Sequence, residues 1–377
     1  MPDKILFLKW KDFSLINDSI YKILHDEFPD MDIDVIDVYD IWRKKVGNRQ
    51  YLNVWHFINE YGKDFIYGYK KRSRKNVLLW FRFTSYVTQL LNKHIQQAAK
   101  GKNYKFTFQT RHMFNGKIKG IPHFIYTDHT MLTNLLYPDI NPRQYMRSQK
   151  FIKKIEQAIY EDATMIFTCG SLPTYSLINQ YKIPKEKALT VYAGSNVPNK
   201  FVENDAKYAY KNILFVGVDW KRKGGPVLLE VFEKVLQKHE DASLTIVGCS
   251  PKNIKLPNCN VVGKIKGDQV PEYYNKATIF CMPTLREPFG IVFVEAMHYK
   301  LPIVANNIGS IPDMIINDFN GYLVDNNVNE YADRICNLLD DPKKCKQLGE
   351  NGYTYAQSKF TWEIVGETMK AEIVKYL

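Results

Sequence analysis

The sequence has no apolar run long enough to cross a bilayer. Its longest uncharged apolar stretches, such as Ala277 to Leu285, are far shorter than the roughly 20 residues that a membrane-spanning helix needs. The first residues, Met1-Pro2-Asp3-Lys4, lack the basic-then-apolar pattern of a secretory signal. The six cysteines form no Cys-x-x-Cys pair and mostly fall within apolar stretches, which is typical of small core residues in a reducing compartment. We therefore expect a cytoplasmic protein.

Several common site motifs are also missing. The sequence contains no Walker A loop, no dinucleotide-binding glycine pattern, no Gly-x-Ser-x-Gly and no zinc-type spacing of histidines. Asp30, Asp32 and Asp34 have the Asp-x-Asp spacing that can hold a divalent metal. They alternate strictly with apolar residues, however, and this alternation is typical of a half-exposed strand with its acids facing solvent. We therefore expect neither a metal nor a resident cofactor.

What the chain does have is a globular composition and an uneven charge. It has 377 residues, 45% of them hydrophobic and 24% charged, which suits two domains with substantial cores. Residues 1–190 hold 30 Lys and Arg against 18 Asp and Glu, whereas the remainder holds 22 of each and is neutral. This excess points to an anionic partner of the first half: a membrane surface, a nucleic acid or a phosphorylated substrate. A solvated basic face is the alternative.

Short β-branched apolar runs alternate with helical patterns along the chain, which predicts parallel βαβ units. A polar break near residue 200 separates two such series, so we expect two doubly wound α/β domains. In sheets of this kind ligands bind beyond the carboxyl ends of the strands. The turns that follow the expected strands are therefore the places to look for a site.

The turn after the expected strand Thr278–Met282 carries Glu287, and a spacer of seven residues that contains Gly290 separates it from a second carboxylate, Glu295. Backbone N–H groups at the start of the following helix would form an anion site, and Gly290 would allow close approach. The carboxylates would then accept hydrogen bonds from ligand hydroxyls. Alternatively, Glu287 only complements the helix dipole and Glu295 faces solvent.

Two further turns carry polar side chains. Lys221, Arg222 and Lys223 follow the strand expected at Ile213–Val218, where a ligand would bind, and Arg222 or Lys223 would neutralise a diphosphate leaving group. His129 follows the strand expected at Phe124–Thr127 and would hydrogen-bond a hydroxyl or take part in acid–base chemistry. Taken singly, each is equally compatible with an ordinary surface turn or a structural histidine.

Together these motifs resemble the family 4 retaining glycosyltransferases of the GT-B fold, closely from about residue 160 to 370 and more loosely before it. The Glu-x7-Glu block is the most specific match. The resemblance implies that Glu287 contacts hydroxyls of the donor sugar, that Glu295 contacts the ribose and that His129 meets the donor sugar. It further implies that Lys223 and Arg222 stabilise the leaving phosphate, while Lys264 and Ile265 flank the base. Backbone amides that would hold the diphosphate or sugar belong to Phe289, Gly290, Ile291 and Val292.

The resemblance also implies the architecture: an acceptor-side Rossmann-like domain at residues 1–198, a nucleotide-sugar-binding domain at 199–358 facing it across a central cleft, and a helix at 359–377 crossing back. The implied reaction is metal-independent transfer of a sugar from a nucleotide-sugar donor to an acceptor hydroxyl, lipid-linked or on a glycan, with retention at the anomeric carbon. Two alternatives stay open. Another GT-B enzyme, such as a sugar-nucleotide epimerase or a phosphorylase, explains the two domains, and a basic nucleic-acid-binding protein explains the charge, although no nucleic-acid motif accompanies it.

The basic segment Lys70-Lys71-Arg72-Ser73-Arg74-Lys75 precedes a helical pattern over Val77–Gln97 that is rich in aromatic and aliphatic residues. Such a combination is typical of an interfacial helix, so peripheral contact with the anionic inner face of a membrane is one expectation. The other is that the apolar positions of this helix pack on the N-terminal sheet.

Overall fold

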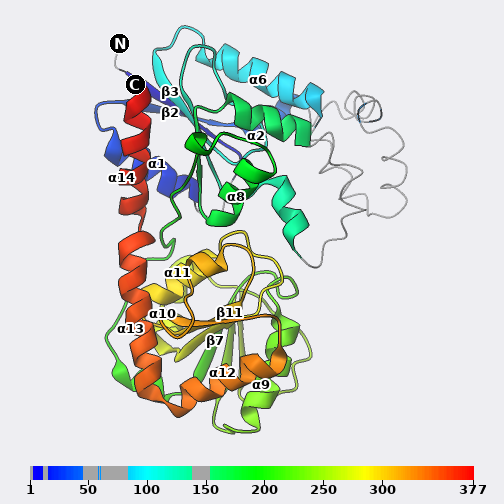
Figure 1. Ribbon diagram of the computed structural model, residues 1–377, viewed down its shortest axis with the longest axis vertical. Coiled ribbons are helices and arrows are strands. Elements are labelled where there is room, and N and C mark those ends of the chain that lie inside the picture. The colour runs from blue at the N-terminus through cyan, green and yellow to red at the C-terminus, as the bar shows by residue number, and fades with distance from the viewer. Residues whose placement is uncertain (1–2, 12–15, 46–57, 59, 61–83, 138–152) are drawn as a thin grey trace. The chain divides into compact units, whose positions relative to one another are not determined.

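The computed structural model describes residues 3–11, 16–45, 58, 60, 84–137 and 153–377. The chain divides into two compact units (Figure 1). The N-terminal unit comprises Met1–Val191 together with Gly366–Leu377, and the C-terminal unit comprises Tyr192–Val365. The first boundary therefore lies between Val191 and Tyr192, a little before the expected one at 198, and the chain returns to the first unit within the last helix.

The N-terminal unit is built on a parallel six-stranded sheet with the order β2-β1-β3-β4-β5-β6. Five of its strands were expected from apolar runs, and the short edge strand β6 was not. The strands are β1 Lys4–Lys9, β2 Asp32–Asp37, β3 Tyr104–Thr110, β4 His123–Thr127, β5 Met165–Thr168 and β6 Ala188–Thr190. The described helices are α1 Ile16–Glu27, α2 Val38–Lys45, α6 Ser85–Ala99, a helix at 153–162, and α8 Ser171–Asn179.

The apolar side of helix α6 is buried in the N-terminal unit. Val87, Leu91 and Ile95 are completely buried, in one core cluster with residues of β1 such as Leu6 and Leu8. The helix is capped by Thr84, whose side chain accepts a hydrogen bond from the Val87 N–H at 3.2 Å. The apolar side of this helix therefore packs on the N-terminal core and is not open to a membrane. The first part of the expected helix, with the basic segment before it, lies outside the described residues.

The strand expected from the alternating acids is present as β2, but Asp34 is half-buried and forms ion pairs instead of only facing solvent. Asp34 lies 2.7 Å from Lys102 Nζ and accepts a hydrogen bond from the Tyr104 hydroxyl at 2.6 Å. Lys4 Nζ lies 3.4 Å from the same carboxylate. The hydrogen bonds from Lys102 and Tyr104 lower the pKa of Asp34 to about 2. This carboxylate thus joins β2 to its neighbouring elements at the surface of the sheet.

The C-terminal unit has a second parallel sheet with the order β12-β11-β10-β7-β8-β9. Helices α10 and α11 lie on one face of this sheet and α9 and α12 on the other (Figure 1). A short 3-10 turn, Ile311–Asp313, follows the strand at Ile303–Asn306. The strands are β7 Asn212–Val216, β8 Ser243–Val247, β9 Cys259–Gly263, β10 Ile279–Met282, β11 Ile303–Asn306 and β12 Gly321–Val324. The helices are α9 Gly225–Leu236, α10 Val270–Lys276, α11 Ile291–His298, α12 Val328–Asp340 and α13 Pro342–Lys359.

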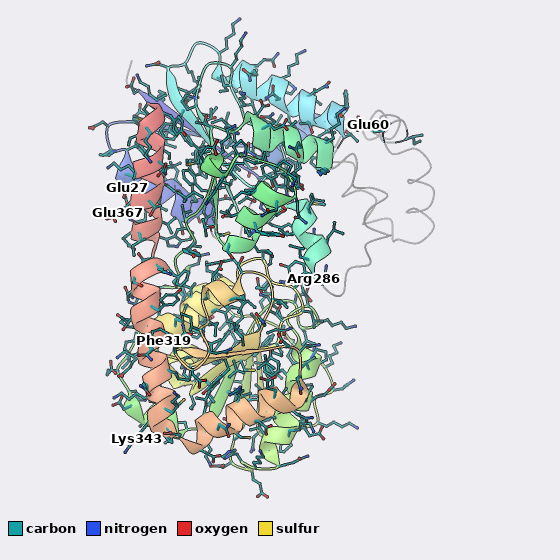
Figure 2. The ribbon with its side chains drawn as sticks, in the orientation of Figure 1. Glu27, Glu60, Arg286, Phe319, Lys343 and Glu367 are labelled. Atoms are coloured by element: carbon teal, nitrogen blue, oxygen red, sulfur yellow. The ribbon has the colours of Figure 1, made fainter. Side chains whose placement is uncertain are left out.

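The last helix, α14 (Trp362–Ile373), begins in the C-terminal unit and from Gly366 onward belongs to the N-terminal unit. Within the N-terminal unit it lies beside α1, where Lys370 Nζ is 3.4 Å from a carboxylate oxygen of Glu27 (Figure 2). Among the described residues, no helix combines the length and the apolar character that crossing a membrane requires. Because all strands of each sheet are parallel, the loops that follow them gather at one edge, where a ligand site is expected.

Candidate functional site

The segment from Glu287 to Glu295 begins in the loop after β10 and ends within α11. Gly290 is the residue before the helix and has a left-handed backbone with φ of 95°. A Cβ added at Gly290 would come within 2.6 Å of the Phe293 ring and within 3.0 Å of Glu287 Cγ. Only glycine therefore lets the chain turn into α11 this tightly while Glu287 stays against the turn. This brings the carboxylate of Glu287 to the N-terminal end of the helix.

Glu287 pairs with a lysine that is distant in sequence. The Lys223 ammonium, on the loop after β7, donates a hydrogen bond to Glu287 Oε2. Lys223 is 7% exposed and Glu287 is 6% exposed, so the pair is buried. Arg222 Nη1 lies 4.0 Å from the same oxygen. The same guanidinium nitrogen donates a hydrogen bond to the backbone carbonyl of Arg286 at 2.8 Å (Figure 2). Two of the three expected cations thus converge on Glu287, while Lys221 is exposed.

The two loops are held together by close backbone contact. Gly224 has φ of 76°, and a Cβ there would lie only 1.7 Å from the carbonyl oxygen of Pro283. The Leu285 N–H also donates to the Arg222 carbonyl at 2.9 Å. Because β7 and β10 are neighbours in the sheet, these contacts fix the β7 loop against the β10 loop. The Lys223–Glu287 pair is therefore a consequence of strand order together with a glycine at position 224.

Glu295 lies within α11 and is buried, at 4% exposed, so it does not face solvent. Its carboxylate accepts a hydrogen bond from the Tyr274 hydroxyl at 2.9 Å. Burial raises the pKa of Glu295 to about 7, although the hydrogen bonds from Tyr274 and from the Asn196 backbone and the charge of Lys223 act in the opposite direction. Glu295 thus titrates in the physiological range.

The remaining candidates on the C-terminal unit follow its strands as expected. Phe289 is buried, with its ring centroid 6.3 Å from that of Phe360, and Ile291 and Val292 are half-buried in the first turn of α11. Lys264 is exposed and Ile265 half-buried, directly after β9. All of these residues follow the carboxyl ends of strands of one sheet, which makes this edge the candidate donor site.

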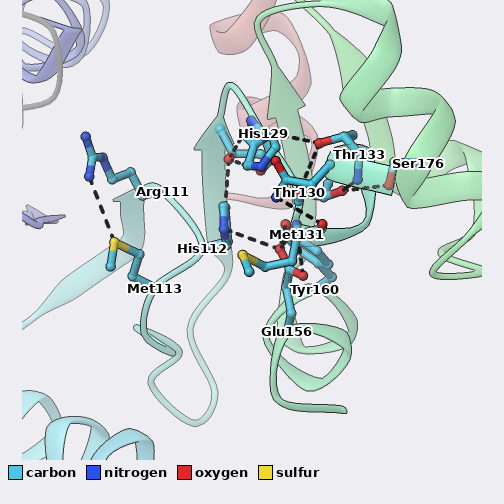
Figure 3. Close-up of polar contacts among 12 residues, drawn as sticks. Arg111, His112, Met113, His129, Thr130, Met131, Thr133, Glu156, Tyr160 and Ser176 are labelled. Atoms are coloured by element: carbon cyan, nitrogen blue, oxygen red, sulfur yellow. Dashed lines mark hydrogen bonds and ion pairs between the residues drawn. The ribbon is translucent and has the colours of Figure 1, made fainter. Parts of the chain in front are cut away.

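His129 belongs to the N-terminal unit and follows β4. Its ring is fixed by Thr133, whose hydroxyl oxygen lies 2.7 Å from His129 Nδ1 (Figure 3). Burial lowers the pKa of His129 to about 4, and a hydrogen bond with the Asn134 side chain only partly offsets this effect. The imidazole is therefore neutral at physiological pH. It suits hydrogen bonding to a hydroxyl group rather than the neutralisation of a phosphate.

Sequence reasoning missed three residues around these candidates. Tyr274 bonds Glu295, while His112 and Glu156 form a buried polar cluster behind His129. Tyr274 and Glu156 lie on helices, where periodicity gave no reason to select them, and His112 follows the end of β3. The position of His112 beyond a strand end was the one signal that could have drawn attention to it.

The pKa of Glu295 generates a stability prediction. Because the folded protein holds the proton of Glu295 more tightly than the unfolded chain does, this residue's contribution to stability falls as pH rises from about 4.5 to about 7. Glu295→Gln has no titrating carboxyl group at this position and therefore does not show this pH-dependent loss of stability. The unfolding free energy of wild type relative to Glu295→Gln should therefore decrease by up to about 3 kcal/mol over this range, as measured by urea unfolding. The same change at exposed Glu272 should give no such trend, and a pH-independent difference for Glu295→Gln would contradict the buried titration.

Comparison with known proteins connects this geometry to a family. Residues 179–355 match the family model described as glycosyl transferases group 1. An uncharacterized glycosyltransferase of Methanocaldococcus jannaschii is 28% identical over 189 residues, which is 48% of this chain and 51% of the relative. The chain thus spans about half the length of this curated relative.

Solved structures match over nearly the whole chain. Sucrose-phosphate synthase from Thermosynechococcus elongatus superposes with a TM-score of 0.69 and 16% identity, covering 99% of this chain and 98% of the synthase. The Anabaena protein HepE, in complex with UDP and glucose, superposes with a TM-score of 0.65 and 14% identity, covering 99% of this chain and 100% of HepE. The chain therefore has the GT-B fold, and residues 179–355, nearly all of them in its C-terminal unit, match the glycosyl transferases of group 1.

Proposed function

We propose that the protein is a retaining glycosyltransferase of the family 4 type that moves a sugar from a nucleotide-sugar donor to an acceptor hydroxyl without an essential metal. The observation that carries this proposal is the buried Lys223–Glu287 pair at the N-terminal end of α11. It places a cation for a phosphate next to a carboxylate for sugar hydroxyls. The match to group 1 glycosyl transferases and the UDP and glucose bound by HepE support a nucleotide-sugar donor.

Each candidate residue has a distinct part in the proposed reaction. As the bond between the sugar and the diphosphate breaks, negative charge grows on the phosphate, where Lys223, Arg222 and the backbone amides at the start of α11 would stabilise it. Glu287 would accept hydrogen bonds from sugar hydroxyls and orient the sugar. Lys264 and Ile265 would flank the base, and Glu295 would accept hydrogen bonds from the ribose hydroxyls. His129 would hydrogen-bond a hydroxyl of the donor sugar.

The acceptor is proposed to bind the N-terminal unit and to carry a free hydroxyl on a glycan or a lipid-linked sugar. The basic excess of residues 1–190 supports an anionic acceptor or an anionic surface that carries it. Because the apolar side of α6 is buried, membrane contact through the described part of this helix would rely on charge. We therefore propose a cytoplasmic protein that contacts the inner face of the membrane peripherally, through the basic charge of its N-terminal half.

Removing either partner of the pair tests the donor site. Glu287→Ala and Lys223→Ala should each lower the transfer rate by at least about 100-fold, because each removes a preorganised contact to the transition state. Glu295→Ala should mainly raise the donor KM, since a ribose contact is shared by ground and transition states. The matched control is Lys221→Ala, which removes an exposed cation from the same loop and should leave the rate unchanged.

These variants need a folding check, because removal of one partner leaves a buried charge behind and costs about 3–5 kcal/mol. Rates are therefore compared at a temperature where circular dichroism shows every variant folded. Identification of the product by NMR separates the alternatives: a glycoside with the anomeric configuration of the donor supports the proposal, whereas a free sugar isomer or a sugar phosphate indicates an epimerase or a phosphorylase. Near-wild-type transfer by folded Glu287→Ala would refute the assigned site.

Metal independence is tested with a chelator. Transfer should continue at an unchanged rate in EDTA, because Lys223, Arg222 and the helix N-terminus are proposed to stabilise the leaving diphosphate. Loss of turnover in EDTA that Mg²⁺ or Mn²⁺ restores would mean that a metal supplies this stabilisation instead.

Co-sedimentation with vesicles tests the membrane proposal. Wild-type protein should bind anionic but not neutral vesicles, and salt should weaken the binding, since each Lys or Arg near an anionic leaflet adds about 1 kcal/mol. Neutralising Lys70, Lys71, Arg72, Arg74 and Lys75 together should release the protein. Protein that stays in the supernatant with anionic vesicles at low salt would direct the search to soluble acceptors.

A further inference from the structure

A buried carboxylate lies behind His129 in the N-terminal unit. Glu156, on helix 153–162, is 2% exposed and accepts hydrogen bonds at both of its oxygens. The Met131 N–H lies 3.0 and 3.2 Å from the two oxygens, and the Tyr160 hydroxyl lies 2.8 Å from one of them (Figure 3). The Tyr181 hydroxyl donates to the other oxygen, and His112 Nε2 lies 3.4 Å from the first.

One route from Glu156 to His129 runs through the backbone. Met131 begins the 3-10 turn η3 (Met131–Leu136), so Glu156 holds the first N–H of this turn. Thr130 caps the turn by accepting from the Thr133 N–H at 3.2 Å. Thr133 is the residue whose hydroxyl contacts the imidazole of His129. Anchoring the turn through Met131 therefore fixes the partner of the His129 ring.

A second route runs through side chains. His112 Nε2 lies 3.4 Å from Glu156, and its Nδ1 lies 3.2 Å from the Thr127 hydroxyl. Thr127 in turn donates to the His129 carbonyl at 2.8 Å, and its oxygen lies 3.3 Å from the His129 N–H. The backbone of His129 is thus held by Thr127, and Thr127 is in contact with His112, which lies beside Glu156.

The chemistry of this position calls for a carboxylate. Donors approach both oxygens, and an amide would turn an NH₂ group toward some of them. Burial raises the pKa of Glu156 to about 7 and lowers that of His112 to about 3, so the pair carries no strong ionic stabilisation. Burying a carboxyl group costs desolvation, and this one is held by the Tyr160 and Tyr181 hydroxyls while its contacts with Met131 and His112 lead to the turn that carries His129.

We propose that Glu156, acting with His112, is a positioning residue that holds the turn at 129–133 so that the imidazole of His129 is presented in one orientation to the donor sugar. This inference rests on the proposed function, because it needs His129 to contact that sugar. Its geometric part, that Glu156 sets the orientation of the His129 ring, is independent of activity.

The test compares Glu156→Gln with His129→Ala and with the double variant. Glu156→Gln should lower kcat about tenfold or more, the effect expected when the support of a contacting residue is lost. The donor KM should change less than about twofold, since the nucleotide contacts are proposed on the C-terminal unit. In the His129→Ala background the same change should lower kcat less than about twofold, because Glu156 acts through His129. Losses that multiply in the double variant, or a fully active Glu156→Gln, would overturn the proposal.

Asp162→Asn is the matched control: it makes the same chemical change on the same helix, at a carboxylate that bonds Asn115 and Lys117 instead. It should leave kcat unchanged. The ¹⁵N signals of the His129 imidazole provide a readout that needs no turnover, and they should shift in Glu156→Gln but not in Asp162→Asn. If wild type transfers no sugar from any nucleotide-sugar donor, the proposed function fails, and these signals still decide whether Glu156 positions His129: unchanged signals overturn that as well.

Discussion

The buried ion pair between Lys223 and Glu287 is the constraint on which the rest of the proposed donor site depends. A buried pair gains little net stability, because the cost of removing both charges from water offsets their attraction. The role of the pair is to hold both side chains in position before a ligand binds. A diphosphate can offer Lys223 a new anionic partner while sugar hydroxyls offer Glu287 new donors, and neither side chain then has to be desolvated or oriented at the moment of reaction. The same pair thus serves as a structural contact and as the two halves of a prepared site.

The Lys223–Glu287 pair forms because strand order and two glycines bring the loops that carry these residues together. The strand order places β7 beside β10, so that the loops after both strands meet at one edge of the sheet. Gly224 then lets the first loop touch the second, and Gly290 lets α11 start directly behind Glu287. A side chain at either glycine would force these backbones apart and separate Lys223 from Glu287. The Lys223–Glu287 pair therefore depends on two glycines, Gly224 and Gly290, in the left-handed backbone conformation.

The sequence was sufficient to predict the strands other than β6 and the turns that carry the candidate site residues, because buried parallel strands are short apolar runs and ligands gather beyond their carboxyl ends. It could not show that Lys223 bonds Glu287, since the contact spans 64 residues and depends on which strands are neighbours. Nor could it show that Glu295 is buried against Tyr274, or that Glu156 lies behind His129, since helical periodicity does not reveal what a polar residue meets. The apolar pattern of α6 was equally compatible with a membrane and with a sheet, and only packing decided between them.

A structure of the protein with an intact nucleotide-sugar tests the central claim most directly. The account predicts that a phosphate oxygen of the donor lies within hydrogen-bond distance of Lys223 Nζ and at the N-terminal end of α11, with a sugar hydroxyl donating to Glu287. A donor bound elsewhere, with the Lys223–Glu287 pair intact and touching neither phosphate nor sugar, would contradict it.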